Sequence, residues 1–277
     1  MLRSALVALD GSTDSESAAD LAIDWAARYG SRLLGLAIVD APTIARAEPV
    51  PLGAGAYKKA RDEARLVDAH RRVTECLADF RARGQGAGVP VEVLEDTGAP
   101  AVRILREAQR CDVVILGRET HFHFETQEQP DETLAQVLRG SPRPVVVVPR
   151  SVRAGRGVLL AYGGGREAAR ALQTFQLLGL AAGEDIEVVS IHPDGAEAEA
   201  LVDLADEYLT AHRAPHRLHP IVSARPPGEV LLDRIRRARP RLVVMGAHGY
   251  HPLRDLFGTS VTRAVVQECP VPTFIGA

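Results

Sequence analysis

Glycines and hydroxyl side chains gather near the C-terminal end of the sequence at a spacing that suits a phosphate group. The segment Gly246-Ala-His-Gly249 is followed by eight residues and then by Gly258-Thr259-Ser260. Backbone N–H groups bind phosphates best where the chain folds closely around them, which residues without a Cβ allow. We expect Thr259 and Ser260 to open a helix, whose first N–H groups and hydroxyls can donate to phosphate oxygens. The spacing predicts an anion site, and a glycine-rich turn without a ligand is the alternative.

An earlier stretch repeats the same strand, loop and helix in altered form. Residues 112–117 match 242–246, and the Pro-rich segment 141–149 matches 269–276. The repeat extends to the first strand of each half, because residues 5–10 match 157–162. A fixed internal repeat indicates a duplicated unit. We therefore expect two domains, residues 1–150 and 155–277, with the boundary in the basic, small-residue run 150–156.

Short apolar runs alternate with longer periodic segments along the whole chain, which is typical of α/β proteins with a parallel sheet. The predicted strands of the first half are 4–10, 32–39, 90–95, 112–117 and 144–149, and its helices are 14–29, 58–83, 99–109 and 131–139. The predicted strands of the second half are 157–162, 185–191, 216–223, 241–246 and 272–276. Parallel strands need right-handed crossovers. We predict two Rossmann-like, doubly wound domains, each a five-stranded parallel sheet with helices on both faces and a switch point beside its first strand.

Two local features of the first half carry further expectations. Thr13 and Glu16 have the spacing of a capping box, which predicts that Thr13 caps the first helix. Pro and Gly interrupt the segment 41–56, which follows the second strand. We expect a surface insertion there, with a flap over a ligand as the alternative.

The composition indicates a soluble globular protein. Hydrophobic residues make 46% of the chain, charged residues 25%, and the net charge of −3 gives no general attraction to nucleic acid. No apolar run is long enough to span a membrane and no signal-peptide core follows Met1, so we expect a cytoplasmic protein. The three cysteines, Cys76, Cys111 and Cys269, lack a C-x-x-C spacing. They are expected to be small buried hydrophobes rather than disulfide partners or zinc ligands.

The residues resemble the universal stress proteins, and the repeat resembles a tandem member of that family over nearly the whole chain. The resemblance rests on Val7-Ala-Leu-Asp10-Gly-Ser12, on the Gly246–Ser260 loop and on the terminal Pro270-Val-Pro272 strand. It implies that the loop binds the phosphates and ribose of ATP and that the acid after the first strand lies in the same pocket. The implied binding residues are Gly246, Gly249, Gly258, Thr259, Ser260 and Asp10. ATP, with or without Mg²⁺, is the implied ligand.

The two halves depart from the family pattern in different places. In the first half, Thr120 stands where Gly249 does and Pro130 where Gly258 does, and acidic residues surround them. Proline offers no N–H and the acids repel phosphate, so we expect no ATP there. In the second half the loop persists with one residue fewer than usual in its long gap, but Gly163 replaces the expected acid. The run 163–165 is expected to be a flexible turn, with a second phosphate contact as the alternative.

The resemblance also implies how the domains associate. Residues 145–148 and 273–275 are expected to pair the two halves through their last strands, which removes an exposed strand edge. The same surfaces or helices are expected to form a homodimer of chains.

Other clusters in the sequence indicate a functional site less strongly. His121, His123 and Glu125 alternate as metal ligands can, although a variable surface loop is the favoured interpretation. His248 and His251 flank the glycine loop as secondary phosphate contacts. The arginines between 234 and 241 lack interleaved aromatics, so they indicate a solvated helix face rather than an RNA site.

The functional expectation is a stress-response protein that binds an adenine nucleotide in its second half and acts by nucleotide-dependent association. No nucleophile, base and orienting group stand at a recognisable spacing, so we expect no enzyme beyond slow, incidental ATP hydrolysis. The alternative is an interaction module of the same family that binds no nucleotide. An adenylating enzyme of related fold would need an acid or lysine beside the loop, and the sequence offers none.

Overall fold

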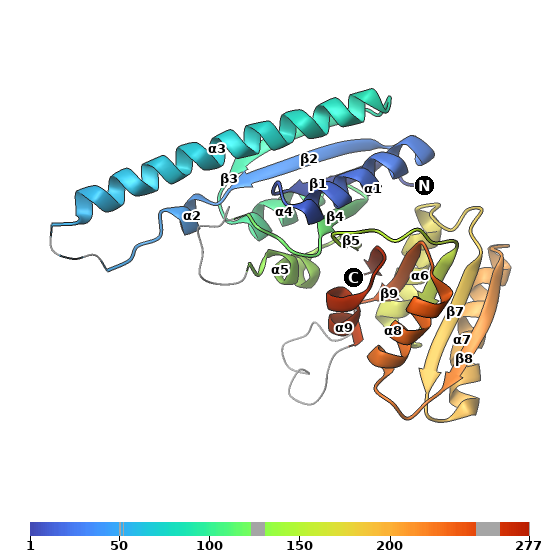
Figure 1. Ribbon diagram of the computed structural model, residues 1–277. Coiled ribbons are helices and arrows are strands. Elements are labelled where there is room, and N and C mark those ends of the chain that lie inside the picture. Colours follow the sequence, from blue (N-terminus) through green and yellow to red (C-terminus); the bar gives the residue numbers. More distant parts are fainter. Residues whose placement is uncertain (50, 52, 123–130, 248–260, 277) are drawn as a thin grey trace.

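Strands and helices alternate along the first half as the apolar periodicity predicts. The structure is a computed structural model and describes residues 1–49, 51, 53–122, 131–247 and 261–276 (Figure 1). The elements of the first half are β1 (Ser4–Leu9), α1 (Thr13–Tyr29), β2 (Arg32–Val39), α2 (Ala41–Ile44), α3 (Gly55–Gly86), β3 (Val91–Thr97), α4 (Pro100–Ala108), β4 (Val113–Gly117), α5 (Thr133–Gly140) and β5 (Val145–Val148).

The second half repeats this order. Its elements are β6 (Val158–Ala161), α6 (Arg166–Leu177), β7 (Ile186–His192), α7 (Gly195–Ala211), β8 (His216–Val222), α8 (Pro227–Ala238), β9 (Leu242–Gly246), α9 (Val261–Glu268) and β10 (Thr273–Gly276). The short helix α2 is an addition that the sequence did not predict, and it lies within the expected insertion 41–56.

The strands of both halves join into one ten-stranded sheet with the order β3-β2-β1-β4-β5-β10-β9-β6-β7-β8. Each half has five parallel strands, with its switch point beside its first strand, between β1 and β4 or between β6 and β9. Only β5 and β10 pair antiparallel in this sheet, with Val146 opposite Phe274. The structure therefore confirms the α/β doubly wound class and the pairing of the last strands inside one chain.

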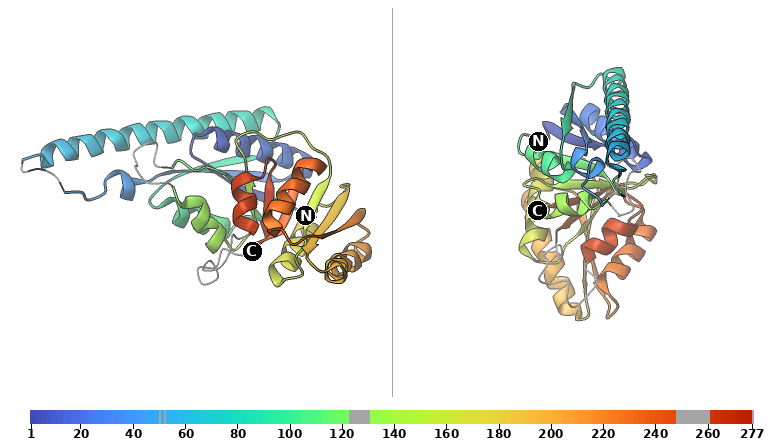
Figure 2. Two further views of the ribbon diagram at one scale, coloured as in Figure 1. Left: turned by 60° about the horizontal axis from the view of Figure 1, so that its bottom comes forward. Right: turned by 90° about the vertical axis from the view of Figure 1, so that its left-hand side faces the viewer.

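Helices cover both faces of the sheet, and each face has a core that runs through both halves. One core holds Trp25 of α1, Phe80 of α3, Phe175 of α6 and Leu209 of α7. The other core takes its buried side chains from α4, α5, α8 and α9. The right-hand view of Figure 2 shows the first half above the second, meeting where β5 and β10 pair.

The start of α1 differs by one residue from the prediction. Ser12, not Thr13, is the N-cap, with φ −78° and ψ 161°, and its side chain accepts from the Ser15 backbone N–H. The reason lies in the preceding turn, because Gly11 takes a positive φ of 73° and the Asp10 carboxylate accepts from the Ser12 N–H. That turn fixes Ser12 at the cap position.

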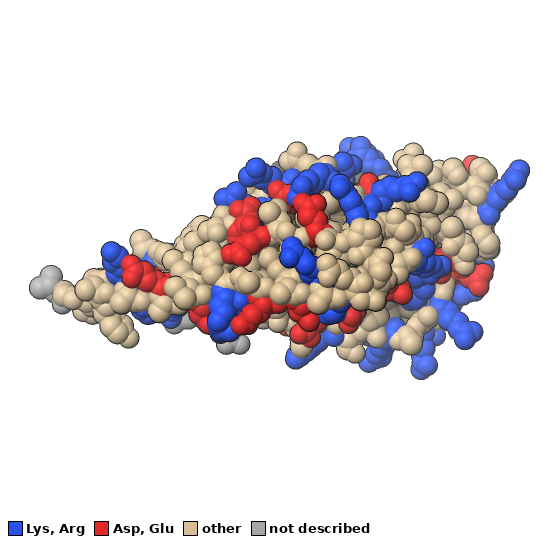
Figure 3. Space-filling view, turned by 90° about the horizontal axis from the view of Figure 1, so that it is seen from above, with Lys and Arg blue, Asp and Glu red and all other residues tan. Residues whose placement is uncertain are grey.

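The helix α3 is longer than predicted and spans about 48 Å at the usual rise per residue. Its buried apolar residues begin at Ala69, and its N-terminal part extends past the end of the sheet (Figure 1). Charges of both signs are interspersed on this face of the molecule (Figure 3), with ion pairs such as Lys59–Glu63 and Arg72–Asp68 along the helix. Its mixed charges indicate that much of α3 is a solvated face.

The three cysteines are free, and Cys111 and Cys269 are buried, as expected of small hydrophobes. Burial raises the pKa of the Cys76 thiol to about 11, so this side chain is protonated at neutral pH. Within the described residues, no helix is both long enough and apolar enough to cross a bilayer.

Candidate functional site

The turn that follows the first strand has the same backbone shape in both halves. Gly11 and Gly164 have φ of 73° and 71°, and the N-caps that follow, Ser12 and Gly165, have φ/ψ of −78°/161° and −80°/166°. The sheet register agrees, because β1 and β6 pair in the same way with β4 and β9. Gly163 therefore occupies the position that Asp10 has in the first half.

In the first half, the Asp10 carboxylate accepts hydrogen bonds from the protein's own backbone. It is 5% exposed, and Oδ1 accepts from Ser12 N at 2.9 Å. Oδ2 accepts from His121 N at 2.6 Å, across the switch point between β1 and β4. The acid thus connects the β1–α1 turn to the loop that follows β4.

The described residues directly after β4 pack against the first half. Phe122 is 1% exposed and belongs to the core that α4 and α5 cover, and its N–H donates to Asp131. The Glu119 N–H donates to the Asp14 carboxylate at 3.4 Å, and burial raises the pKa of Asp14 despite this bond. Asp10 and Asp14, beside the edge where a doubly wound domain binds its ligand, thus accept from the protein's own backbone.

The second half has a cavity of about 160 Å³ at the corresponding place. It lies at the carboxyl ends of β6, β7 and β9, next to the starts of α6, α8 and α9. The lining residues are Ala161, Tyr162, Gly163, Gly165, Ala168, Val189, Ile191, Pro227, Leu231, Met245, Gly246 and Val261. Doubly wound folds bind ligands in this crevice, and an apolar lining of this kind suits a flat ring.

Tyr162 is the only lining residue in the described part of the chain with a titratable side chain. Burial raises its pKa, so the hydroxyl stays protonated at neutral pH. Its backbone carbonyl accepts from the Ser190 hydroxyl at 2.6 Å, which ties the end of β6 to β7. The cavity can therefore offer shape, apolar surface and backbone polar groups, but no carboxylate from these residues.

Of the predicted site residues, the structure places Gly246 on the cavity wall and Asp10 in the other half. Gly249, Gly258, Thr259 and Ser260 lie outside the described residues. The structure does not bring Asp10 and Gly246 into one site.

Gly246 also has a structural reason to be glycine. A Cβ there would lie 2.5 Å from backbone atoms of Glu167 and Ala168, at the start of α6. A Cβ on Gly117, its counterpart in the first half, would lie 2.8 Å from the backbone of Asp14 in the same way. Glycine at this position is therefore explained by the close approach of strand and helix in both halves.

The apolar lining residues were missed by sequence reasoning. Val189, Ile191 and Met245 end buried strands, and Pro227 and Leu231 start the helix after β8. Their positions at the carboxyl edge of parallel strands were a signal that the sequence pattern already contained.

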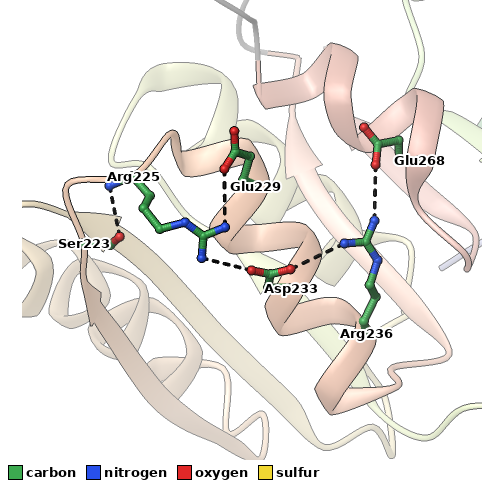
Figure 4. A network of polar contacts seen from close by, with 6 residues as sticks. All are labelled: Ser223, Arg225, Glu229, Asp233, Arg236 and Glu268. Carbon is green, nitrogen blue, oxygen red and sulfur yellow. Dashed lines mark hydrogen bonds and ion pairs between the residues drawn. The ribbon is translucent and has the colours of Figure 1, made fainter.

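The arginines near α8 are paired with carboxylates. Figure 4 shows Arg225 between Glu229 and Asp233, and Arg236 joining Asp233 to Glu268 at the end of α9, with N–O distances of 3.1 to 3.4 Å. Arg234 binds the buried Glu187 at 2.5 Å, and Arg241 binds Glu184 at 2.6 Å. These pairs support a charge-balanced helix face.

The possible metal ligands His121, His123 and Glu125 belong to a loop that the structure describes only in part. His123 and Glu125 lie outside the described residues, and the His121 side chain is 55% exposed. Within the described residues, no cluster of three or more His, Cys, Asp or Glu is placed to hold a metal ion. His248 and His251 also lie outside them.

Comparisons with known proteins agree with the repeat. Residues 1–149 and 156–275 each match the model of the Universal stress protein family. The universal stress protein Slr1230 of Synechocystis sp. is 23% identical over 282 residues, which cover 98% of this chain and 98% of that protein.

Solved structures share the whole two-unit arrangement. A universal stress protein from Archaeoglobus fulgidus superposes with a TM-score of 0.71 at 18% identity, covering 99% of this chain and 97% of that one. A putative universal stress protein from Pseudomonas aeruginosa gives 0.57 at 14% identity, covering 99% and 92%. At these identities the similarity shows the fold alone. Because the two family matches span nearly the whole sequence, the chain belongs to the universal stress protein family of stress-response proteins, with two such units in tandem.

Proposed function

We propose that the second half binds an adenine nucleotide, ATP with or without Mg²⁺, and that the protein acts by nucleotide-dependent association. The observation that carries the proposal is the cavity at the switch point between β6 and β9.

The cavity combines the two surfaces that a nucleotide needs. Its aliphatic walls, such as Val189, Ile191 and Leu231, suit the faces of a purine ring. Val261, the first described residue of α9, is also on the wall. The predicted loop residues directly precede α9 in the sequence. A phosphate chain that leaves the apolar slot toward α9 would meet backbone donors.

A metal ion would be held by the phosphates and by water rather than by the cavity wall. The wall residues within the described ranges carry no carboxylate. For the same reason they supply no general base, and the Tyr162 phenol with its raised pKa is a poor one at neutral pH. The proposed role is binding without catalysis, with hydrolysis slow and incidental.

Association between chains would use helix faces rather than strand addition. The last strands already pair inside the chain, so the sheet ends at β3 and β8. β3 carries Glu92, Glu95 and Asp96, and β8 carries Pro220, all of which oppose pairing with another strand. We propose a homodimer of this kind in the cytoplasm.

A bulky residue in the cavity tests the binding proposal. A Cβ at position 163 would have no atom within 4 Å, so Gly163→Phe adds a ring to the cavity without a backbone clash. We expect wild-type protein to melt at a higher temperature with millimolar ATP, and Gly163→Phe to lose this shift.

The matched control is Val102→Phe, which adds similar bulk at a position 61% exposed in the first half. It should keep the full ATP-induced shift. A wild-type protein whose melting does not respond to ATP would instead favour the nucleotide-free interaction module.

A further inference from the structure

The N-terminal part of α3, residues 55–68, has no counterpart in the second half of the chain. The equivalent helix α7 begins directly after β7, whereas α3 begins at Gly55, at the end of the insertion, and its first buried apolar residue is Ala69. This extension runs past the end of the sheet (Figure 1), and Arg61 pairs with Glu48 of the insertion. Short helices without packing partners are only marginally stable in water. The fold thus supplies little packing surface for the α3 extension.

The outward side of the α3 extension carries large, exposed apolar side chains. Tyr57 is 75% exposed and Val67 is 70% exposed. Together with two exposed alanines, they recur at intervals of three, four and three residues, which is the spacing of a coiled-coil seam. We call this set the α3 stripe: Tyr57, Ala60, Ala64 and Val67. Because an α-helix turns by about 100° per residue, the α3 stripe lies on the side opposite to Ala69, which packs in the core.

The charges beside the α3 stripe fit a second copy of the same helix in antiparallel orientation. Residues on the same flank of the two seams meet in such a pair. With Ala64 of one chain opposite the partner's Val67, Arg61 lies beside the partner's Asp68. A shift by one heptad would instead place Arg61 beside the partner's Arg61 and Glu63 beside the partner's Glu63. Repulsion of like charges disfavours the shifted register, so the flanking charges select the first one.

Resting on the proposed homodimer, we propose that two chains associate through their α3 stripes, antiparallel, with Ala64 and Val67 nearest the two-fold axis. The two sheets then lie on opposite sides of the helix pair, because each stripe faces away from its own sheet. In this register the ring of Tyr57 packs on the partner's Thr74 and leaves water. The residues that line the cavity of the second half come from other elements, so the interface and the nucleotide site can be tested separately.

Sedimentation equilibrium of the full chain, with and without millimolar ATP, tests the interface. We expect wild type to form a dimer and Val67→Lys to be a monomer at the same concentration. Two lysines would be buried without partners near the axis, which should raise the dissociation constant by about a hundredfold. The matched control is Val102→Lys on α4, where the valine is 61% exposed, and it should remain a dimer. Circular dichroism checks that both variants are folded.

Disulfide cross-linking tests the register. The variant that combines Ala60→Cys with Arg71→Cys places these two positions opposite each other in the proposed pair. Within one helix they lie about 16 Å apart, too far for a disulfide, so a bond between them must join two chains. We expect mass spectrometry to find this bond after mild oxidation, with oxidised wild type as the control for the native cysteines. A bond between two copies of position 60 would indicate parallel helices and overturn the register.

The failure of this inference differs from the failure of the proposed function. If wild type forms a dimer and Val67→Lys forms the same dimer, the α3 stripe is not the interface and this inference is wrong, while association between chains stands. If wild type remains a monomer with and without ATP, the proposed homodimer is wrong, and this inference with it. The α3 stripe would then be left to a different protein partner.

Discussion

The residues at the switch point make different contacts in the two halves of the molecule. In the first half, Asp10 and Asp14 accept from the backbone N–H groups of His121 and Glu119, and Phe122 is buried in the core. The second half has the same turn with Gly163 in place of the acid, and a cavity of about 160 Å³ beside it. The comparison teaches that a duplicated unit can keep its backbone while the acid that would face a ligand takes on a structural task.

The first half also contacts the second half through Arg118, a residue whose equivalent in the second half makes no such contact. Arg118, directly after β4, donates to the carbonyls of Gln267 and Cys269 at the C-terminal end of α9. The equivalent residue after β9 is Ala247, which cannot make such contacts. Arg118 thus connects the first half to α9, and Val261 of this helix lines the cavity.

The largest expected effect tests whether the shared glycines are structural. Gly117→Ala and Gly246→Ala should each lower the free energy of unfolding by about 3 kcal/mol, because the added methyl group overlaps the backbone of α1 or α6. Chemical denaturation measures this, with Gly163→Ala as the control that has open space. If only Gly117→Ala destabilised the protein, Gly246 would be a residue for the ligand alone.

The second-largest effect is expected at Glu187, a buried charge whose counterpart in the first half is apolar. Glu187 of β7 is 2% exposed and stands where the first half has Leu34. Burial by itself would raise the pKa of Glu187, but hydrogen bonds from Arg217 and Arg234 outweigh it and lower the pKa below the ordinary 4.5. Glu187→Gln should lower the free energy of unfolding by about 2 kcal/mol at neutral pH.

The sign of the pH dependence follows from that lowered pKa. The contribution of Glu187 is present above pH 4.5 and is lost as the pH falls through the folded-state pKa. The stability difference between wild type and Glu187→Gln should therefore shrink on acidification. A difference that stays constant down to low pH would contradict the ion-pair account.

A smaller effect is expected for Asp10, which connects the β1–α1 turn to the residues after β4. Asp10→Ala leaves the N–H groups of Ser12 and His121 without their acceptor, at a cost of about 1.5 kcal/mol. Nucleotide binding should not change, because the first half holds no ligand in this account. Calorimetry with ATP provides the check, and a loss of binding in Asp10→Ala would make Asp10 a ligand residue after all.

The smallest effect is expected at the paired arginines of α8. Arg236→Ala breaks exposed ion pairs to Asp233 and Glu268 and should change the free energy of unfolding by less than about 0.5 kcal/mol. A large loss would show that the contact between α8 and α9 matters for the open half. Glu268→Ala is the matched control for the second of these pairs.

The fold could be predicted from the sequence because its signals are local and repeated. Apolar runs such as 145–148, and their copies in the second half, indicated the parallel strands, whereas the pairing of β5 with β10 was implied by the family resemblance. The cap of α1 was off by one residue, since the turn at Gly11 depends on a side chain that reaches back to the backbone.

The site was harder to predict. Gly246 was predicted as a ligand contact, but the equivalent Gly117 of the first half has a packing reason that only the strand–helix distance reveals. The hydrogen bond from His121 N–H to Asp10 joins residues 111 positions apart, which no local pattern indicates. The apolar wall of the cavity was not predicted because it draws single residues from several elements.

Native mass spectrometry of the purified chain with added ATP tests the central claim most directly. The account predicts about one nucleotide per chain, and none in Gly163→Phe, because the proposed site is the cavity of the second half, while Asp10 of the first half accepts from its own backbone. Two nucleotides per chain would contradict the proposal that the first half binds none. No nucleotide at any concentration tested would contradict binding in the second half.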